Sequence, residues 1–166
     1  MRNNALPNIA IIGATGAVGK AFISVIEHLT FKFDQLFLVA SSRSAGRIVK
    51  NQLGEFEVQD IARFDFTQVD YAFFTAGGDV SRQWAKHAIA AGAVVIDNTS
   101  AYRMDNNVPL IVPEVNQTHC QQQPLIANPN CSTIQIVRAL APIHALFGLD
   151  KVIVSTYQAA SGAGNA

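Results

Sequence analysis

The feature that most constrains the fold of this chain is a glycine-rich loop between two apolar segments near its N-terminus. Residues 8–12 give a mainly apolar run, and Gly-Ala-Thr-Gly-Ala-Val-Gly follows at residues 13–19. Apolar side chains then recur at helical spacing, at Val18, Phe22, Val25, Ile26 and Leu29. Strand, glycine turn and helix in this order are typical of a dinucleotide-binding unit. Because the spacing is GxxGxxG rather than GxGxxG, a βα turn without a ligand stays an alternative.

The rest of the chain continues this alternation. Apolar runs predict strands at residues 35–40, 71–74, 94–97, 125–127 and 151–157, and a hairpin within residues 48–60. Helical spacing predicts one helix from an N-cap at Asp79 to Gly92, and another over residues 132–147 before Gly148. This order predicts an α/β fold with a Rossmann-like, doubly wound, mainly parallel sheet.

Composition excludes several classes of protein. The 166 residues are 49% hydrophobic and 14% charged, with a formal net charge of zero, which indicates a globular chain. Lysine and arginine form no basic stripe, so we expect no nucleic-acid partner. No apolar run approaches the ~18 residues of a membrane-spanning helix. Two cysteines are too few for a disulfide framework and indicate a reducing, cytoplasmic setting.

The loop after the second predicted strand bears on the choice of nicotinamide cofactor. Sites that prefer NAD usually place Asp or Glu there, to bind the ribose 2′-hydroxyl. Residues 41–46 contain neither, and offer serines, including Ser44, together with Arg43. These groups suit a 2′-phosphate, so the sequence favours NADP over NAD. A solvated serine-rich loop is the alternative.

Two more loops follow predicted strands, where ligands bind in doubly wound sheets. Gly77, in a glycine pair after residues 71–74, would let the backbone approach a cofactor closely. Arg103 follows residues 94–97 and is a candidate anion clamp, in one segment with Asn98 and Ser100. A surface arginine is the alternative.

Cys131 follows the strand predicted at residues 125–127 and stands at the start of the last predicted helix. The helix N-terminus favours a thiolate through its unpaired N–H groups and its positive dipole end. On spacing alone, a small buried hydrophobic residue is the more common outcome for such a cysteine.

Four stretches together resemble the aspartate-β-semialdehyde dehydrogenase family. They are residues 13–19, 97–103, 128–133, and 155–158 with 161–164. The resemblance implies NADPH-dependent interconversion of 4-phospho-L-aspartate and L-aspartate 4-semialdehyde, with phosphate, in lysine, methionine, threonine and diaminopimelate biosynthesis. It makes Cys131 the nucleophile of an acyl-thioester route. Asn130 would position the carbonyl, and Gln158 would orient the substrate.

The resemblance also implies ligands for the remaining loops. Arg103, with Asn98 and Ser100, would bind the phosphate or substrate. The cofactor would contact Gly13, Thr15, Gly16, Ala17 and Val18 at its pyrophosphate, Arg43 and Ser44 at its 2′-phosphate, and Gly77, Ser161 and Gly162 elsewhere. The complete enzyme is expected to be a homodimer or homotetramer.

One departure from the family matters for activity. The family is roughly twice as long, and its catalytic histidine lies in a second domain. His28, His87, His119 and His144 match no such motif. We therefore expect residues 1–150 to form the dinucleotide-binding domain and residues 151–166 to begin a truncated α+β substrate domain, with its first strand exposed to pairing with another chain. This chain alone is expected to bind cofactor without turnover.

Two alternatives stay open. One is N-acetyl-γ-glutamyl-phosphate reductase, which tends to flank its cysteine with glycine and tyrosine, where this chain has Asn130 and Ser132. The other is a non-catalytic dinucleotide-binding module, in which Cys131 would be unreactive.

Overall fold

A seven-stranded sheet organises the computed structural model, which describes residues 6–158. Its strands are β1 (Ile9–Ile12), β2 (Leu36–Ala40), β3 (Ile48–Asn51), β4 (Gly54–Asp60), β5 (Tyr71–Phe74), β6 (Val94–Asp97) and β7 (Leu125–Ala127). The α-helices are α1 (Ala17–His28), α2 (Gly78–Ala90), α3 (Pro113–Asn116) and α4 (Cys131–Phe147). Short 3₁₀ turns lie at η1 (Phe66–Gln68) and η2 (Gln117–Cys120).

The strand order is β3-β4-β2-β1-β5-β6-β7, and every pair is parallel except the β3–β4 hairpin. β1 lies at the centre, with β2 on one side and β5 on the other. The chain therefore reverses its direction of winding beside β1, which is where ligands bind in such sheets. The doubly wound α/β fold predicted from the sequence is confirmed.

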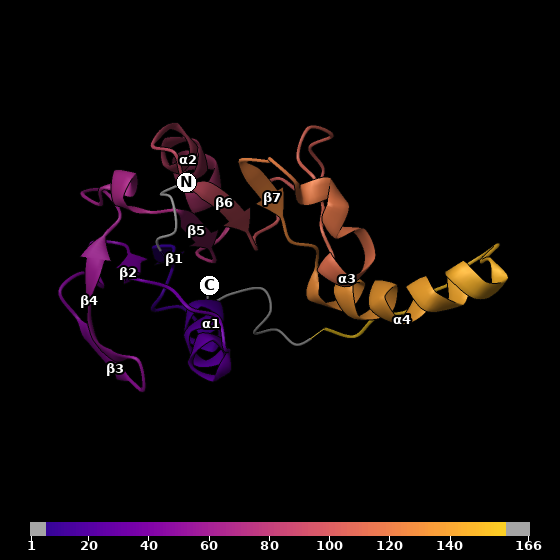
Figure 1. The fold of residues 1–166 in the computed structure, drawn as a ribbon, viewed down its shortest axis with the longest axis horizontal. Coiled ribbons are helices and arrows are strands. Elements are labelled where there is room, and N and C mark those ends of the chain that lie inside the picture. Colours follow the sequence, from indigo (N-terminus) through magenta and orange to yellow (C-terminus); the bar gives the residue numbers. More distant parts are fainter. Residues whose placement is uncertain (1–5, 159–166) are drawn as a thin grey trace.

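Each face of the sheet carries its own core. In β1, Ile9 and Ile11 pack toward α1, together with Ile23 and Ile26 of that helix. Ala10 and Ile12 pack on the opposite face in one cluster with Ala85 and Ala88 of α2. The two helices accordingly lie on opposite sides of the sheet (Figure 1). Because both faces are covered, the central strands β1, β2 and β5 are continuously apolar rather than alternating.

The face of α1 that packs on the sheet differs in part from the predicted one. Phe22 and Ile26 of the predicted stripe pack in the core, whereas Val18, Val25 and Leu29 are 42–55% exposed. Gly19 and Ile23, outside the predicted stripe, are buried. A Cβ atom on Gly19 would lie 2.3 Å from the Gly13 carbonyl oxygen. The absence of a side chain at Gly19 lets the helix approach the glycine loop, and this contact sets which face turns inward.

The predicted N-cap of α2 is also wrong. The helix begins at Gly78, and its N-cap is Gly77, with φ of +103° and no side-chain capping bond. Asp79 lies in the first turn instead, where it pairs with Arg82 at 2.7 Å. A carboxylate there still favours the helix through the dipole.

The last helix leaves the sheet. α4 begins at Cys131, ends before Gly148, and has no buried residue along its 17 positions. In Figure 1 it extends away from β7, beyond the edge of the sheet. Its apolar face is therefore not part of either core.

The strand predicted at residues 151–157 is absent. Residues 151–158 are extended but carry no strand pairing, because no described strand lies beside them to supply hydrogen bonds. The candidate cofactor residues Ser161 and Gly162 lie outside the described residues. Within residues 6–158, no helix is long and apolar enough to cross a membrane.

Candidate active site

The loops that follow β1, β2 and β5 are fastened to one another. The Gly13 amide donates to the Val39 carbonyl at 2.8 Å, and the Thr75 hydroxyl donates to the Ile12 carbonyl at 2.9 Å. Gly13 has φ of +95°, and a Cβ atom there would lie 2.8 Å from the backbone of Ala76. Only glycine allows these loops to meet so closely.

The N-terminus of α1 has the form of a phosphate cradle. Its N-cap, Gly16, makes no side-chain capping bond, so the first-turn amides that include Ala17 and Val18 have no side-chain acceptor at the cap. Such amides and the positive end of the helix dipole bind a pyrophosphate well. Thr15 stands beside them, and its hydroxyl donates to the Ser44 hydroxyl at 3.3 Å. This bond joins the glycine loop to the loop after β2.

The two remaining candidate cofactor positions are open. Gly77 has no atom within 4 Å of where a Cβ would stand, so space remains beside the start of α2. Arg43 is exposed on the loop after β2, next to half-buried Ser44. The residues predicted to hold a dinucleotide thus lie together at the carboxyl ends of β1, β2 and β5. The open space beside them and the first-turn amides of α1 fit a dinucleotide.

Arg103 joins the loops that follow β6 and β7. Its Nε donates to the Asn128 carbonyl at 2.9 Å, and its Nη2 donates to the Asn98 carbonyl at 3.0 Å. The side chain of Asn128 also donates to Oδ1 of Asn98, at 2.5 Å. Ser100 is exposed in the same turn. Arg103 is therefore a structural tie between two loops as well as a cation at the sheet edge.

Cys131 is the first residue of α4, as predicted, and it is exposed rather than buried. Asn130 is the N-cap, and its Oδ1 accepts from the Ser132 amide at 3.0 Å. The same Oδ1 lies 3.9 Å from Sγ of Cys131. Gln158 donates from Nε2 to that sulfur at 3.3 Å. Gln158 and Cys131 are 27 positions apart in the sequence, and this hydrogen bond brings them together.

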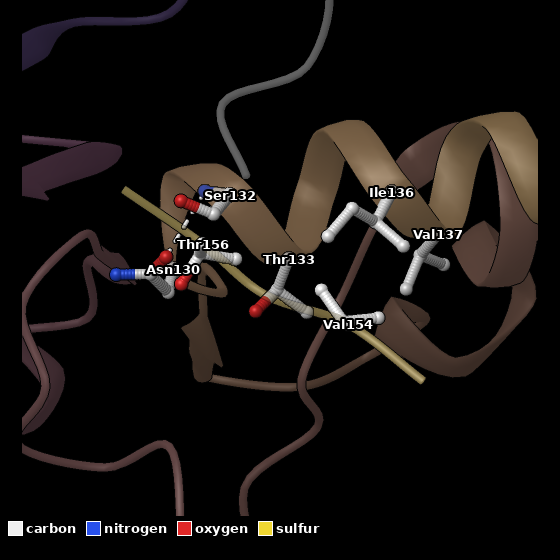
Figure 2. Close-up of a pocket in the computed structure, with 7 residues that line it drawn as sticks. All are labelled: Asn130, Ser132, Thr133, Ile136, Val137, Val154 and Thr156. Atoms are coloured by element: carbon white, nitrogen blue, oxygen red, sulfur yellow. Dashed lines mark hydrogen bonds between the residues drawn. The ribbon is translucent and has the colours of Figure 1, made fainter. Parts of the chain in front are cut away.

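A cavity of about 270 Å³ adjoins this cysteine turn. Figure 2 shows Val154 and Thr156 of the extended segment facing Thr133 and Ile136 in the first turns of α4. Asn130 lies at one end of the lining. The extended segment therefore returns along α4 toward the sulfur, and this course delivers Gln158.

No histidine of residues 6–158 hydrogen-bonds to Cys131. His28 and His87 bond to backbone carbonyls of their own helices, and His144 accepts from the Leu149 amide at the far end of α4. The described residues also hold no cluster of three or more His, Cys, Asp or Glu side chains suited to a metal ion.

The sequence did not predict a cluster of three buried polar side chains near the end of β6. They are Ser81, Asp97 and Thr99. The Ser81 hydroxyl donates to Oδ1 of Asp97 at 2.8 Å, and the Thr99 hydroxyl donates to Oδ2 at 2.9 Å. An Asp followed two residues later by Thr is a turn signal that could have pointed to part of it. Asn128 stands in the stretch 128–133 that resembles the family, but no sequence signal indicated its contact with Asn98.

Comparison with protein families adds the deciding observation. Residues 8–123 match the model described as "Semialdehyde dehydrogenase, NAD binding domain". The chain belongs to the semialdehyde dehydrogenase family. This semialdehyde dehydrogenase chain is 53% identical over 159 residues to the aspartate-semialdehyde dehydrogenase of Bacillus subtilis, covering 95% of this chain and 46% of the relative.

Solved structures agree. Aspartate semialdehyde dehydrogenase II from Vibrio cholerae matches with a TM-score of 0.90 and 48% identity, over 96% of this chain and 48% of that one. The same enzyme has been solved complexed with ASA. The Candida albicans enzyme, solved with NADP, matches with a TM-score of 0.74 and 29% identity, over 87% of this chain and 48% of that one. The chain spans about half the length of the curated relatives it matches.

Proposed function

We propose that this chain supplies the NADP site and the nucleophile of an aspartate-semialdehyde dehydrogenase. The observation that carries the proposal is Cys131, exposed at the N-terminus of α4 with the Gln158 amide 3.3 Å from its sulfur. A thiol held at a helix N-terminus beside an amide donor is suited to covalent catalysis. The reaction interconverts 4-phospho-L-aspartate and L-aspartate 4-semialdehyde, in the biosynthesis of lysine, methionine, threonine and diaminopimelate.

Each residue has a chemical task in this proposal. In the biosynthetic direction, the Cys131 sulfur forms a bond to the acyl carbon while the bond to phosphate breaks, which gives a thioester and inorganic phosphate. Gln158 orients the substrate, and Asn130 positions the carbonyl. Arg103, with Asn98 and Ser100, binds the phosphate group. When bound, the nicotinamide supplies the hydride that reduces the acyl group to an aldehyde.

The proposed cofactor is NADP rather than NAD. Arg43 and Ser44 would bind the 2′-phosphate, and Gly13, Thr15, Gly16, Ala17, Val18 and Gly77 would line the rest of the described site. The Thr15–Ser44 hydrogen bond supports this reading, because it places the two phosphate-binding loops side by side. The Candida albicans relative solved with NADP also supports it.

We further propose that a second, substrate-binding domain begins after residue 150, that the complete enzyme is a cytoplasmic homodimer or homotetramer, and that the 166-residue chain alone has little turnover. The low turnover is expected because the chemistry needs a proton-transfer group. Within residues 6–158, no histidine is hydrogen-bonded to Cys131. The two free cysteines are consistent with a reducing compartment.

The experiment that tests the function measures NADPH formation from aspartate semialdehyde, phosphate and NADP⁺ by the complete polypeptide that carries this chain. Cys131→Ala is expected to lower kcat at least about a thousandfold, because it removes the nucleophile. Cys120→Ala is the matched control, since among the described residues the Cys120 thiol bonds only to the Gln117 carbonyl, away from Cys131. Turnover that survives in Cys131→Ala would refute the proposal, and preference for the N-acetylglutamate semialdehyde would favour the sister reductase.

A further inference from the structure

Asp97, the last residue of β6, has an unusual environment for a carboxylate. It is fully buried and makes no ion pair with any residue of the described chain. Its oxygens accept three hydrogen bonds instead, from the Ser81 hydroxyl at 2.8 Å, the Thr99 amide at 3.1 Å and the Thr99 hydroxyl at 2.9 Å. Burying a charge without a counter-ion is costly. A buried carboxylate that is held only by hydrogen bonds therefore suggests that those bonds fix a particular local geometry, which apolar side chains could not fix.

Two of these bonds shape the turn after β6, and the third, from Ser81, joins that turn to α2. Ser81 lies in the first turn of α2, and its amide donates to the Gly77 carbonyl at 3.2 Å. Thr99 stands in the turn after β6, and its hydroxyl accepts from the Ala101 amide at 3.1 Å. Asp97 thereby holds the turn at residues 98–103 against the start of α2.

The same turn carries the proposed anion-binding groups, Asn98 beside Asp97 and Arg103 at its other end. Arg103 donates from Nη2 to the Asn98 carbonyl, and the Asn98 side chain accepts from Asn128. These bonds fix the turn within itself and to the loop before Cys131. Asp97 fixes the turn to α2 through Ser81. The Tyr102 hydroxyl, which donates to the Ser81 carbonyl at 3.3 Å, and the Thr99 hydroxyl, 3.2 Å from the Ser81 hydroxyl, fix it there as well. The direction of the Arg103 guanidinium therefore depends on both sets of bonds.

We propose that Asp97, through Thr99 and Ser81, is a positioning residue that sets the geometry of the phosphate site formed by Arg103 and Asn98. The inference rests on the proposed function for the identity of the anion. Asp97 does not touch the anion itself, because its side chain is fully buried beneath the turn.

The test uses the complete polypeptide and measures the Kd of inorganic phosphate by calorimetry and the KM of phosphate in semialdehyde oxidation. Asp97→Ala and Thr99→Val are expected to raise both constants about tenfold, the loss that follows when one charge-assisted contact is misplaced. kcat at saturating phosphate and the KM of NADP⁺ should stay within about threefold. Asp97→Asn should restore near-normal phosphate binding, because its amide keeps the shape and can bond both Thr99 and Ser81.

Asp70→Ala is the matched control. Asp70 accepts from the Asn8 amide at 2.8 Å, just before β5, at the amino end of the strands. It should lower stability without changing phosphate binding. Thr99→Val keeps the side-chain volume and decides the question if Asp97→Ala does not fold.

Lower kcat with unchanged phosphate constants in both folded variants would show a merely structural role and overturn the inference. A wild-type protein that does not bind phosphate would overturn it too. If the wild type binds phosphate but does not oxidise the semialdehyde, the proposed function fails, and the Kd series still decides the role of Asp97.

Discussion

At Gly13, both the backbone conformation and the close packing of its neighbours require glycine. Its φ is +95°, and an added Cβ would meet Ala76 at 2.8 Å. We predict that Gly13→Ala lowers the free energy of unfolding by about 2–5 kcal/mol, the sum of backbone strain and overpacking. Urea denaturation of the two proteins measures this difference.

Gly92 supplies the control for that prediction. Its φ of +97° is almost the same, but no atom lies within 4 Å of its Cβ position. Gly92→Ala should therefore cost only the strain, about 1–2 kcal/mol. Equal losses in the two variants would mean that the contact between Gly13 and Ala76 contributes nothing.

Tyr102 carries a pH dependence that the structure explains. Burial raises the pKa of Tyr102 above its ordinary value of 10.0, and the Asp97 carboxylate raises it further. Because the folded-state pKa is the higher one, the associated stability is present below pH 10 and is lost as pH rises through the folded value. We predict that Tyr102→Phe loses less stability than the wild type as pH rises above 10, as measured by urea denaturation at several alkaline pH values. Identical alkaline profiles would contradict this.

Among the elements, the loop after β2 carries the prediction about cofactor choice. Arg43→Ala is expected to weaken NADPH binding about 10- to 100-fold, because a charge-assisted contact to the 2′-phosphate is lost. NADH lacks that phosphate, so its affinity should stay within about twofold. Calorimetric titration with each nucleotide measures both values.

Lys50→Ala is the control for Arg43. It removes the same charge from β3, where Lys50 pairs with Glu55 at 2.6 Å on the outer hairpin. A general effect of charge would weaken NADPH binding in both variants, and an equal loss of NADH affinity in Arg43→Ala would contradict the assignment of the 2′-phosphate site.

The elements also show which features a single sequence specifies. The parallel strands β1, β2, β5, β6 and β7 were predictable because strands covered on both faces are mainly apolar, whereas the more exposed β3 and β4 followed from the hairpin pattern within residues 48–60. The inward face of α1 was not, because Gly19 contributes no apolar signal although its missing side chain sets the contact with Gly13. The strand expected at residues 151–157 has a β-branched pattern, but pairing needs a neighbour that the pattern cannot supply.

In the candidate site, too, local features were predictable from the sequence and contacts between distant residues were not. Cys131 at a helix N-terminus followed from local spacing, since the turn and the helix are adjacent in the sequence. The Asn98–Asn128 bond joins residues 30 positions apart, and the Ser81–Asp97 bond joins residues 16 apart. Such pairings depend on the order of strands in the sheet, which periodicity does not specify.

At the scale of the whole molecule, α4 ends in an exposed apolar surface. Leu146 is 76% exposed and Phe147 81% exposed, on a helix without buried residues. We predict that the 166-residue chain self-associates through this surface, since contiguous exposed apolar groups mark association sites. Leu146→Glu with Phe147→Glu should shift the chain to monomer in sedimentation velocity.

Met104→Glu is the control, because Met104 is 93% exposed on a different loop. Association that persists in the α4 variant, or that Met104→Glu abolishes equally, would show that α4 is not the surface responsible.

The central place of β1 has a consequence for synthesis on the ribosome. β1 is translated early, yet it needs β5 on one side to complete its pairing, with Ile12 beside Phe74. At about 5–20 residues per second, about 3–12 seconds separate the emergence of these two residues. During that interval one edge of β1 has no partner, so we expect the nascent chain to be open to pairing with another chain at this edge until β5 has emerged.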